Sequence, residues 1–451
     1  MRGEGGRHVE AIAAYFRFAE RGTNLATETR AGLTTFMVMA YIIFVNPSIL
    51  NAGAGIDMAA ASAATALVAG IMTIAMGVVG NYPFALAAGL GLNGIVAFGL
   101  VAGKGLTPEG AMGVIVWEGA VITILVIVGL REAIMNAVPL SLKRAIGVGI
   151  GLFILFIGFH NGGLISGNAG DPPVLATFPT QPGHFVFLAG LALTIVLYVM
   201  KVRGALIVSI LATTALAIIV GVAQVPKEFV ATPSFATLLK FDLGNVFSLG
   251  AITAVLTIFA IMLSDFFDTM GTVTGVAAEA GLTDAQGRVP GVGRVLVVDG
   301  LAAAAGGLAG ISSNTTYIES AAGVAEGGRT GFTSVVVGVL FLLAILLSPI
   351  AGIVPPQATA PALVLVGYLM FMLIRDIPVA DVEDGLPALL TMILMPLTFD
   401  ITVGIGAGFI SWVLIKVVRQ KAGEVHWLMW AVSIAFAIYF AKDYIEALLP
   451  K

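Results

Sequence analysis

Apolar runs about as long as a membrane crossing follow one another along nearly the whole chain. A transmembrane helix needs about 20 mostly apolar residues, and shorter polar stretches separate the runs here. Fourteen runs can be placed, seven before and seven after a more polar connection at 226–244: 31–50, 58–79, 84–101, 110–130, 142–159, 184–200, 204–224, 248–273, 292–310, 312–326, 331–354, 358–374, 386–398 and 401–418. The pattern predicts an all-α polytopic membrane protein with fourteen transmembrane segments.

Two of these runs depart from the pattern in the same way. The third run opens with the glycine-rich stretch FALAAGLGLN, residues 84–93, and the tenth opens with the polar stretch ISSNTTYIE, residues 311–319. Both stand third in their half of the chain. Irregular backbone at membrane depth is tolerated only where it lines a cavity or is covered by protein. Interrupted segments at corresponding positions therefore indicate the binding site of a secondary transporter.

The number of spans also predicts how the two halves are related. Because each half has an odd number of spans, the second half must cross the membrane in the opposite orientation. We therefore expect two inverted seven-span repeats, at 29–225 and 248–420, joined by a connecting segment at 226–247. Residues 1–28 form a polar arm, either a short interfacial helix or a flexible tail. Residues 421–451 follow the repeats, and their apolar part, 427–441, is an interfacial helix or a fifteenth crossing.

The distribution of Lys and Arg predicts the orientation in the membrane. If the arm is cytoplasmic, most basic residues of the short loops fall on the cytoplasmic side, with Lys104, Lys227 and Lys240 as exceptions. The predicted outer loops 51–57, 160–183 and 354–357 contain no Lys or Arg. Positive charge is retained on the cytoplasmic side of membranes. We expect a multi-pass protein of the cell membrane, plasma or inner, with its N-terminus in the cytoplasm.

Composition narrows the classes of function. Of 451 residues, 59% are hydrophobic and 11% are charged, whereas soluble domains carry about 25% charged residues. The formal net charge of −4 argues against nucleic-acid binding. The absence of cysteine excludes disulfides and thiolate metal sites. We expect a lipid bilayer as partner, no enzyme activity and no metal.

Candidate chemistry begins with two acidic residues at the end of the eighth run. Asp265 and Asp268 lie three residues apart in the stretch SDFFDTMG, a spacing that places both on one face of a helix. An ionisable group at bilayer depth costs about 2.5–3.5 kcal/mol on insertion scales, and such groups are usually functional. We interpret this helix as one wall of a transport site.

Acidic residues inside the membrane also suggest ion coupling. Burial and a neighbouring carboxylate both favour the protonated form of a carboxyl group. Such a group can take up a proton on one side and release it on the other. We expect proton symport, with Glu319 or Asp265 as the carrier and Asp268 beside them. A sodium ion bound by the same oxygens is the alternative, and no other cofactor is expected.

Other polar residues favour structural roles. Glu118 in the fourth span and Asp299 in the ninth are expected to bond a neighbouring helix. Asp400 lies at a span boundary and is expected to be solvated, and His160 and His184 flank a predicted outer loop.

Two other classes of protein fit the sequence poorly. An intramembrane aspartyl protease needs two carboxyl groups that face each other from different elements, but Asp265 and Asp268 share one helix. An anion transporter needs positive potential at its site, and the charges here are acidic.

Three long motifs resemble those of the AzgA-like nucleobase permeases. They are NLATETRAGLTTFMVMAYIIFVNP at 24–47, DFFDTMGT at 265–272 and TTYIESAAGVAEGGRTG at 315–331. The resemblance runs from about Thr23 to the end of the chain. It implies a permease for guanine, hypoxanthine or adenine with the UraA-like fold. That fold has a core domain and a gate domain that move relative to each other, and short extended segments open spans three and ten. Xanthine or uracil is the alternative substrate.

The resemblance also implies roles for individual residues. Asp265 and Glu319 contact the purine, Asn93 contributes from span three, and Asp268 supports the site. Gly91 and Thr316 belong to the two short segments that enclose the substrate, and Arg329 anchors the inner end of span ten. Phe266 or Tyr317 could stack on the purine ring. A homodimer through the gate domain is expected on the same ground.

Overall fold

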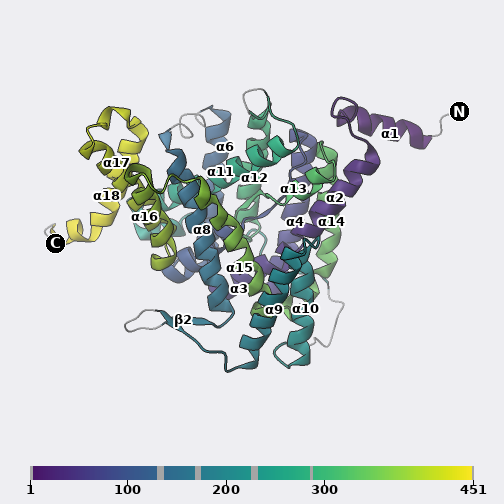
Figure 1. Cartoon of the computed structure of the whole chain (residues 1–451), viewed down its shortest axis with the longest axis horizontal. Helices are drawn as coiled ribbons and strands as arrows, with labels where there is room; N and C mark the ends of the chain where they lie inside the picture. The colour runs from purple at the N-terminus through teal and green to yellow at the C-terminus, as the bar shows by residue number, and fades with distance from the viewer. Residues whose placement is uncertain (1–3, 130–136, 168–173, 225–231, 285–287, 449–451) are drawn as a thin grey trace.

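The computed structural model of the chain describes residues 4–129, 137–167, 174–224, 232–284 and 288–448, and most of them are helical (Figure 1). Residues 226–231 of the predicted connecting segment, and with them Lys227, lie outside the described residues. The elements of the first half are α1 (Glu4–Tyr15), α2 (Leu25–Met39), α3 (Ile42–Ala54), α4 (Met58–Ala75), η1 (Met76–Gly80), β1 (Leu86–Ala88), α5 (Leu90–Gly94), η2 (Ile95–Gly103), α6 (Pro108–Ile127), α8 (Leu140–Asn161), β2 (Ile165–Gly167), β3 (Val174–Ala176), α9 (Pro182–Val199) and α10 (Ala205–Ile219).

The second half repeats this order of long helices around one short strand. Its elements are η3 (Asn245–Leu249), α11 (Ala251–Glu279), α12 (Val292–Leu308), β4 (Asn314–Thr316), α13 (Ser320–Ala325), α14 (Gly331–Ala344), η4 (Ile345–Ile353), α15 (Pro356–Phe371), η5 (Met372–Asp376), α16 (Val382–Thr398), α17 (Ile401–Val418), η6 (Ala422–Glu424) and α18 (Trp427–Leu448). The predicted all-α membrane fold is confirmed. Nine helices within the described residues are long and apolar enough to cross a membrane, so the count of fourteen spans stays a prediction.

The helices pack in two groups, which correspond to the expected core and gate domains. In the core domain α6 lies along α12, α4 lies along α14, and α2, α3 and α11 join them. In the gate domain α8 lies along α15 and α16, and α9, α10 and α17 complete the group. Each group combines helices of both halves, as expected for interlocked repeats.

The two interrupted segments meet in the middle of the core domain. Strands β1 and β4 pair antiparallel, with Leu86 opposite Thr316 and Ala88 opposite Asn314. Two flanking backbone bonds extend the pairing, from Gly89 N to Ser313 O (2.9 Å) and from Tyr317 N to Ala85 O (2.9 Å). Each strand therefore supplies the hydrogen bonds that the other lacks at this depth. The expectation that short extended segments open spans three and ten is confirmed.

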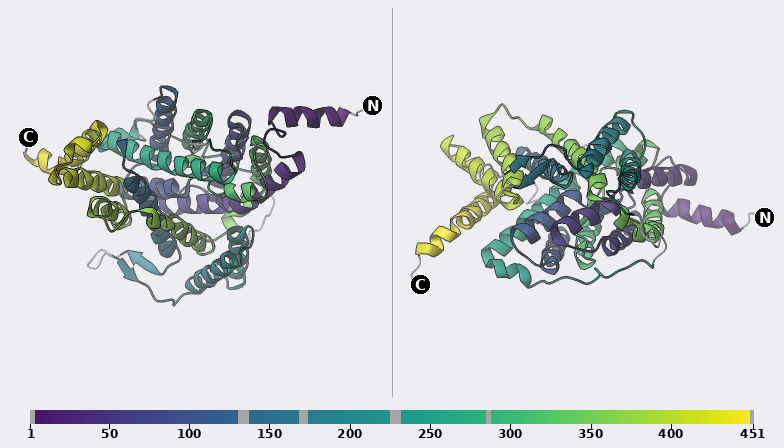
Figure 2. Two further views of the ribbon diagram at one scale, coloured as in Figure 1. Left: turned by 45° about the horizontal axis from the view of Figure 1, so that its top comes forward. Right: turned by 90° about the horizontal axis from the view of Figure 1, so that it is seen from below.

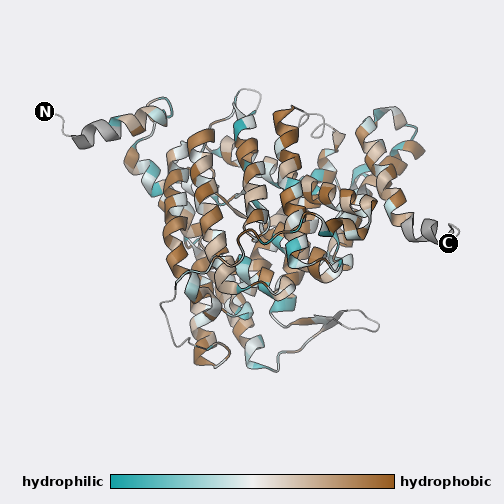
Figure 3. Ribbon diagram, turned by 180° about the vertical axis from the view of Figure 1, so that it is seen from behind, coloured by the Kyte–Doolittle hydropathy of each residue, from teal (hydrophilic) through white to brown (hydrophobic). Residues whose placement is uncertain are grey.

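The outside of the helix bundle is apolar. Figure 3 shows hydrophobic residues in brown along the outer helices, and large apolar side chains are exposed there, such as Ile127 on α6, Val199 on α9 and Leu346 in η4. Exposed apolar surface of this extent indicates contact with lipid.

The two ends of the chain leave the bundle on opposite sides (Figure 2). The N-terminal arm contains the helix α1. Behind it Phe16 and Phe18 are buried against Phe332, with ring centroids 5.5 and 5.9 Å apart. The arm is therefore attached at residues 16–18 and is not a flexible tail there. At the other end α18 packs on α17, where Phe436 contacts Phe409.

Candidate functional site

A cavity of about 100 Å³ lies between the paired strands and the gate domain. The core domain contributes residues from the break between α2 and α3, from the ends of β1 and β4, and from α11. The gate domain contributes Ile150 from α8 and Val366 and Met370 from α15. The lining residues are Tyr41, Gly89, Leu90, Gly91, Leu92, Ile150, Ser264, Asp268, Thr272, Thr315, Thr316, Tyr317, Ile318, Glu319, Val366 and Met370. Both domains form the wall, so a ligand here would contact each of them.

Two carboxyl groups lie at the cavity wall. Glu319 lies three residues after the end of β4 and directly precedes α13, and its Oε1 accepts a hydrogen bond from the hydroxyl of Tyr41 (2.6 Å). Tyr41 lies between α2 and α3 and is itself buried. Asp268 lies on α11 and also lines the cavity.

Asp265 lies behind β4 and does not line the cavity. Its carboxyl is fully buried, and the Ser313 hydroxyl donates to its Oδ2 (3.0 Å). The helical period explains the difference from Asp268. Ser264, Asp268 and Thr272 are spaced four residues apart and form the stripe of α11 that lines the cavity. Asp265 is one residue away from that stripe and therefore points toward α6 and α12.

Of the other predicted site residues, some line the cavity and others are buried away from it. Gly91 and Thr316 line the cavity, and so does Tyr317. Asn93 is fully buried outside the cavity wall, and its Nδ2 donates to Ala88 O (3.4 Å). Phe266 is also buried away from the wall, edge-on to Phe267 at 5.7 Å. Of the two aromatic candidates, the structure therefore places Tyr317 at the cavity. The predicted contacts with a purine remain predictions.

Asp299 of α12 holds β4 in place. Its Oδ1 accepts hydrogen bonds from the Thr316 amide (3.0 Å) and hydroxyl (2.8 Å), and its Oδ2 accepts one from Thr269 on α11 (2.7 Å). Thr269 in turn bonds the Thr315 hydroxyl (2.7 Å). The strand is thus fixed to two helices by side-chain hydrogen bonds. The predicted structural role of Asp299 agrees with this geometry.

Two further expectations can be compared with the structure. Arg329 Nη1 donates to Val324 O (2.7 Å) and Gly328 O (2.8 Å), so it does anchor the end of α13. The expectation that Asp400 is solvated is wrong. Asp400 caps α17 and forms an ion pair with Lys104, in which both side chains are largely buried.

Sequence reasoning missed Tyr41 as a residue of the site. Its only signal was its place in the motif at 24–47, because an uncharged side chain in an apolar run does not stand out. The break between α2 and α3 brings it to Glu319.

Comparison with known proteins agrees with this arrangement. Residues 27–407 match the Permease family (Xan_ur_permease). The chain belongs to this family. It is 42% identical to a putative permease of Methanocaldococcus jannaschii, over 96% of this chain and 98% of that protein. It is 39% identical to the guanine/hypoxanthine permease PbuG of Bacillus subtilis, over 95% and 99% of the two chains.

A third relative and the solved structures extend the comparison. The chain is 38% identical to the adenine permease AdeQ of Escherichia coli, over 95% of each chain. The transmembrane domain of the cyanobacterial bicarbonate transporter BicA superposes with a TM-score of 0.62 at 13% identity, covering 85% of this chain and 96% of that one. At that identity the likeness supports the fold alone. The predicted resemblance to the nucleobase permeases is confirmed, and the permease is a multi-pass membrane protein and not an enzyme.

Proposed function

We propose that this permease carries purine nucleobases, guanine, hypoxanthine or adenine, across the cell membrane in symport with protons. One observation carries the proposal: two carboxyl groups and the free ends of two paired strands meet in a cavity between the two domains. Proteins named guanine/hypoxanthine and adenine permeases are 38 and 39% identical to this chain over nearly its whole length.

The lining groups suit a flat, uncharged heterocycle. The edge of a purine carries both N–H donors and ring-nitrogen acceptors. Asp268 and Glu319 can accept from the donors, and backbone groups of Gly91 and Thr316 can complete the pairing. Tyr317 and the apolar side chains of Ile150 and Val366 supply the surface for the ring faces. A few polar groups in an otherwise apolar slot are typical of small-molecule sites.

Proton coupling and alternating access follow from the same arrangement. A cavity walled by two domains can open to either side when one domain moves relative to the other. Carboxyl groups at this depth can bind a proton with the substrate and release it afterwards. Sodium binding by the same oxygens is the competing mechanism.

An uptake panel tests the proposal. Radiolabelled adenine, guanine, hypoxanthine, xanthine and uracil would be offered to cells without their own nucleobase permeases, with and without a protonophore or sodium. We expect purine uptake that the protonophore abolishes. Uptake of xanthine or uracil alone would contradict the substrate, and uptake that requires sodium but resists the protonophore would contradict the coupling ion.

Two variants test the cavity assignment in the same cells. Asp268→Asn and Glu319→Gln should each lower uptake at least tenfold at equal surface expression, because each removes one acceptor from the wall. Glu109→Gln is the matched control, since Glu109 is an exposed residue in the first turn of α6. Wild-type uptake in both cavity variants would exclude this cavity as the substrate site.

We also propose a cytoplasmic N-terminus and a homodimer formed through the gate domain. The absence of cysteine makes both easy to test. A single cysteine at Glu10 should react with a membrane-impermeant maleimide only after the cells are opened. Exposed gate-domain positions such as Leu397, replaced by cysteine, should give crosslinked dimers. Labelling of intact cells or a purely monomeric purified protein would contradict the respective proposal.

A further inference from the structure

Glu118 is a buried acid that the transport site as described above does not use. It lies in the middle of α6, and its side chain is completely buried. Its carboxyl group is in hydrogen-bonding contact with that of Asp265. Neither Glu118 oxygen receives a hydrogen bond from an N–H or O–H group of the described residues. The two carboxyl groups face each other from different helices, α6 and α11.

The surroundings of this pair contain other acids and hydroxyl groups. The charge of Asp299 on α12 also acts on Glu118. Ser313 lies beside Glu118 and donates a hydrogen bond to Asp265. The elements η2 and η3 also pack on α6 and contain no ionisable residue. The charged groups that face Glu118 are therefore acidic.

Close helix packing seals the pair from water. A Cβ atom on Gly119 would lie 2.3 Å from Ala304 N, and one on Gly307 would lie 2.8 Å from Val116 N. Such distances mean that the backbones of α6 and α12 touch.

Electrostatics then fixes how many protons the pair holds. Two carboxylates in dry contact repel each other strongly, so both cannot be ionised. A hydrogen bond between two carboxyl groups also requires a proton on one of them. Asp265 receives a hydrogen bond from the Ser313 hydroxyl (3.0 Å), whereas Glu118 receives none from an N–H or O–H group of the described residues. Contact between the two carboxyl groups therefore requires at least one proton on the pair, and Glu118, which has no donor of its own, is the better place for it.

The pair is connected to the cavity through Thr315. This residue lines the cavity, and its hydroxyl donates to Thr269 (2.7 Å) and lies beside Asp265. Asp268, at the cavity wall, lies less than one helical turn beyond Asp265. A proton at the pair is thus separated from the cavity by a single hydroxyl group.

We propose that Glu118 and Asp265 together hold the co-transported proton, with Glu118 as the partner that lets Asp265 take it up and release it. The pair alternates between one proton and a single negative charge, and two protons and no charge. Because α6, α11 and β4 belong to the core domain, the proton moves with the substrate. This inference rests on the proposed proton symport.

Glu118→Gln tests the inference in proteoliposomes that contain purified protein. A glutamine amide can donate permanently to Asp265 and would hold it ionised. We expect exchange of unlabelled for radiolabelled purine to stay within about twofold of wild type. We expect accumulation driven by a proton gradient to fall at least tenfold, and the pH dependence of uptake to flatten. Asp265→Asn combined with Glu118→Gln should add no further loss of gradient-driven accumulation, because groups that act as a unit are not additive.

Each other outcome contradicts a specific statement. Wild-type accumulation and pH profile in Glu118→Gln would overturn the inference. Loss of exchange in a variant with a normal gel-filtration profile would show that Glu118 is needed for substrate transport itself and not for proton coupling, and would overturn it too. Failure of the wild-type protein itself to use a proton gradient would overturn the proposed symport. If Glu118→Gln does not fold, Glu118→Asp replaces it. The shortened acid must shift the pH midpoint of accumulation while exchange persists, and an unchanged midpoint overturns the inference.

Discussion

Glu28 shows how a single buried carboxylate can join two helices of the core domain. It lies in the first turn of α2 and is fully buried. Its carboxyl accepts from the backbone N–H groups of Arg329 (2.9 Å), Thr330 (3.3 Å) and Thr333 (3.2 Å). The hydroxyls of Thr330 (2.8 Å) and Thr333 (2.6 Å) also donate to it. The first N–H groups of α14 have no partner within their own helix, so Glu28 acts as a cap supplied by another helix.

We predict that Glu28→Gln destabilises the protein by about 1–3 kcal/mol. The amide is uncharged, which weakens several hydrogen bonds. Its NH2 group also replaces one acceptor oxygen that faces N–H donors, and an unsatisfied buried group costs about this much. The measurement is the temperature at which half of the detergent-purified protein leaves the monodisperse gel-filtration peak. Glu20→Gln is the control, because Glu20 forms only an exposed ion pair with Arg17 (3.7 Å). Equal midpoints for the two variants would show that the cap is dispensable.

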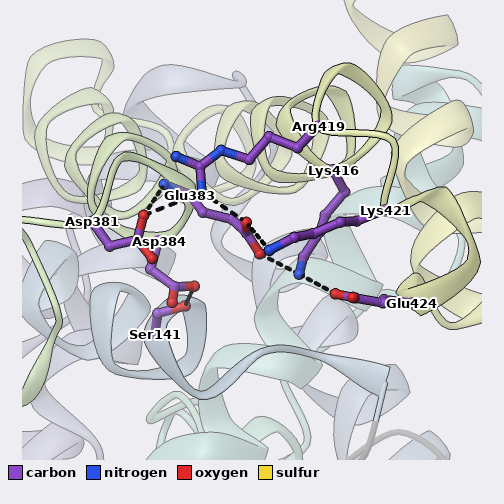
Figure 4. A network of polar contacts seen from close by, with 8 residues as sticks. All are labelled: Ser141, Asp381, Glu383, Asp384, Lys416, Arg419, Lys421 and Glu424. Carbon is purple, nitrogen blue, oxygen red and sulfur yellow. Dashed lines mark hydrogen bonds and ion pairs between the residues drawn. The ribbon is translucent and has the colours of Figure 1, made fainter.

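Glu383 gathers three cations where α16 begins, ahead of the apolar run 386–398. It forms ion pairs with Lys416, with Arg419 (3.0 Å) and with Lys421 (2.9 Å), and Lys416 also contacts Glu424 (2.8 Å) (Figure 4). Hydrogen bonds from Lys416 and then Lys421 lower the pKa of Glu383 from 4.5 to about 2. The network ties the start of α16 to the end of α17.

This shift predicts a pH-dependent difference between wild type and Glu383→Gln. A lowered pKa means that the folded state binds the proton less readily than the unfolded chain. The stabilisation is therefore complete above about pH 4.5 and is lost as the pH falls toward about 2. The melting-temperature gap between the two proteins should be widest above pH 5 and should close in that window. A gap that is constant between pH 7 and pH 3 would contradict the assignment.

At the residue scale the sequence predicted part of the site. Acid residues in apolar runs are rare, so Asp268 and Glu319 could be recognised as site candidates, and the structure places both at the cavity. Asp265 and Asp268 do share the helix α11, but the prediction that their spacing places them on one face is wrong, because only Asp268 lines the cavity. The spacing could not show which residues of that helix meet the cavity, because this depends on where β4 crosses α11. For the same reason the pairing of Asp265 with Glu118 could not be seen in the sequence.

Strand β1 shows how the protein satisfies an unpaired strand edge inside the membrane. One edge of β1 pairs with β4, and side-chain hydroxyls cover the other. Thr73 of α4 accepts from Leu86 N (2.9 Å) and donates to Leu86 O (3.0 Å). Ser334 donates to Phe84 O (2.7 Å) on the same edge, whereas Ser320 Oγ accepts from Ala85 N (3.0 Å) at the end of the pairing with β4. Hydroxyl groups from two helices, α4 and α14, thus take the place of a second neighbouring strand.

We predict that Thr73→Val weakens both the fold and the transport site. The substitution preserves shape but leaves an N–H and a C=O of Leu86 without partners at a depth where water cannot replace them. The expected loss is about 1–3 kcal/mol for each unpaired group, together with weaker substrate binding. Thermal stability and purine binding to the purified protein measure the two effects. Thr214→Val is the control, since among the described residues Thr214 bonds only the Ile210 carbonyl of its own helix (2.7 Å). A similar small effect of both substitutions would contradict the role of Thr73.

At the element scale the sequence indicated the two interruptions but not their pairing. Glycine in one segment and polar residues in the other marked breaks in apolar runs. The register that places Leu86 opposite Thr316 depends on two halves of the chain folding onto each other. Local pattern carries no information on such a contact. The hydroxyl groups of Thr73 and Ser334 gave no signal either, because Ser and Thr are common in transmembrane helices.

At the scale of the whole molecule, the inverted repeats divide the protein into a core and a gate domain. The contacts between these two domains then determine how easily they separate. Lys104 follows η2 in the core domain, and Asp400 caps α17 in the gate domain; their ion pair joins the two, with side-chain exposures of 12 and 18%. The Tyr439 hydroxyl lies 3.3 Å from Lys104 and brings in α18. Beside this contact lies an apolar groove lined by Phe98, His160 and Phe399. If the proposed alternating access separates the two domains at this contact, it breaks the ion pair.

Removing the ion pair should therefore shift the balance between conformations of the permease. A free-energy change of 1.4 kcal/mol alters an equilibrium constant tenfold. A partly buried ion pair such as Lys104–Asp400 can contribute a large part of such a free-energy change. In a Phe98→Cys background, Lys104→Gln should raise the rate of reaction with a water-soluble maleimide several-fold, because Phe98 becomes accessible when the domains separate at this groove. Lys240→Gln makes the same chemical change at an exposed position and should leave the rate as it was. Equal rates in all three proteins would mean that the domains separate elsewhere, and that the contact between Lys104 and Asp400 persists throughout the transport cycle.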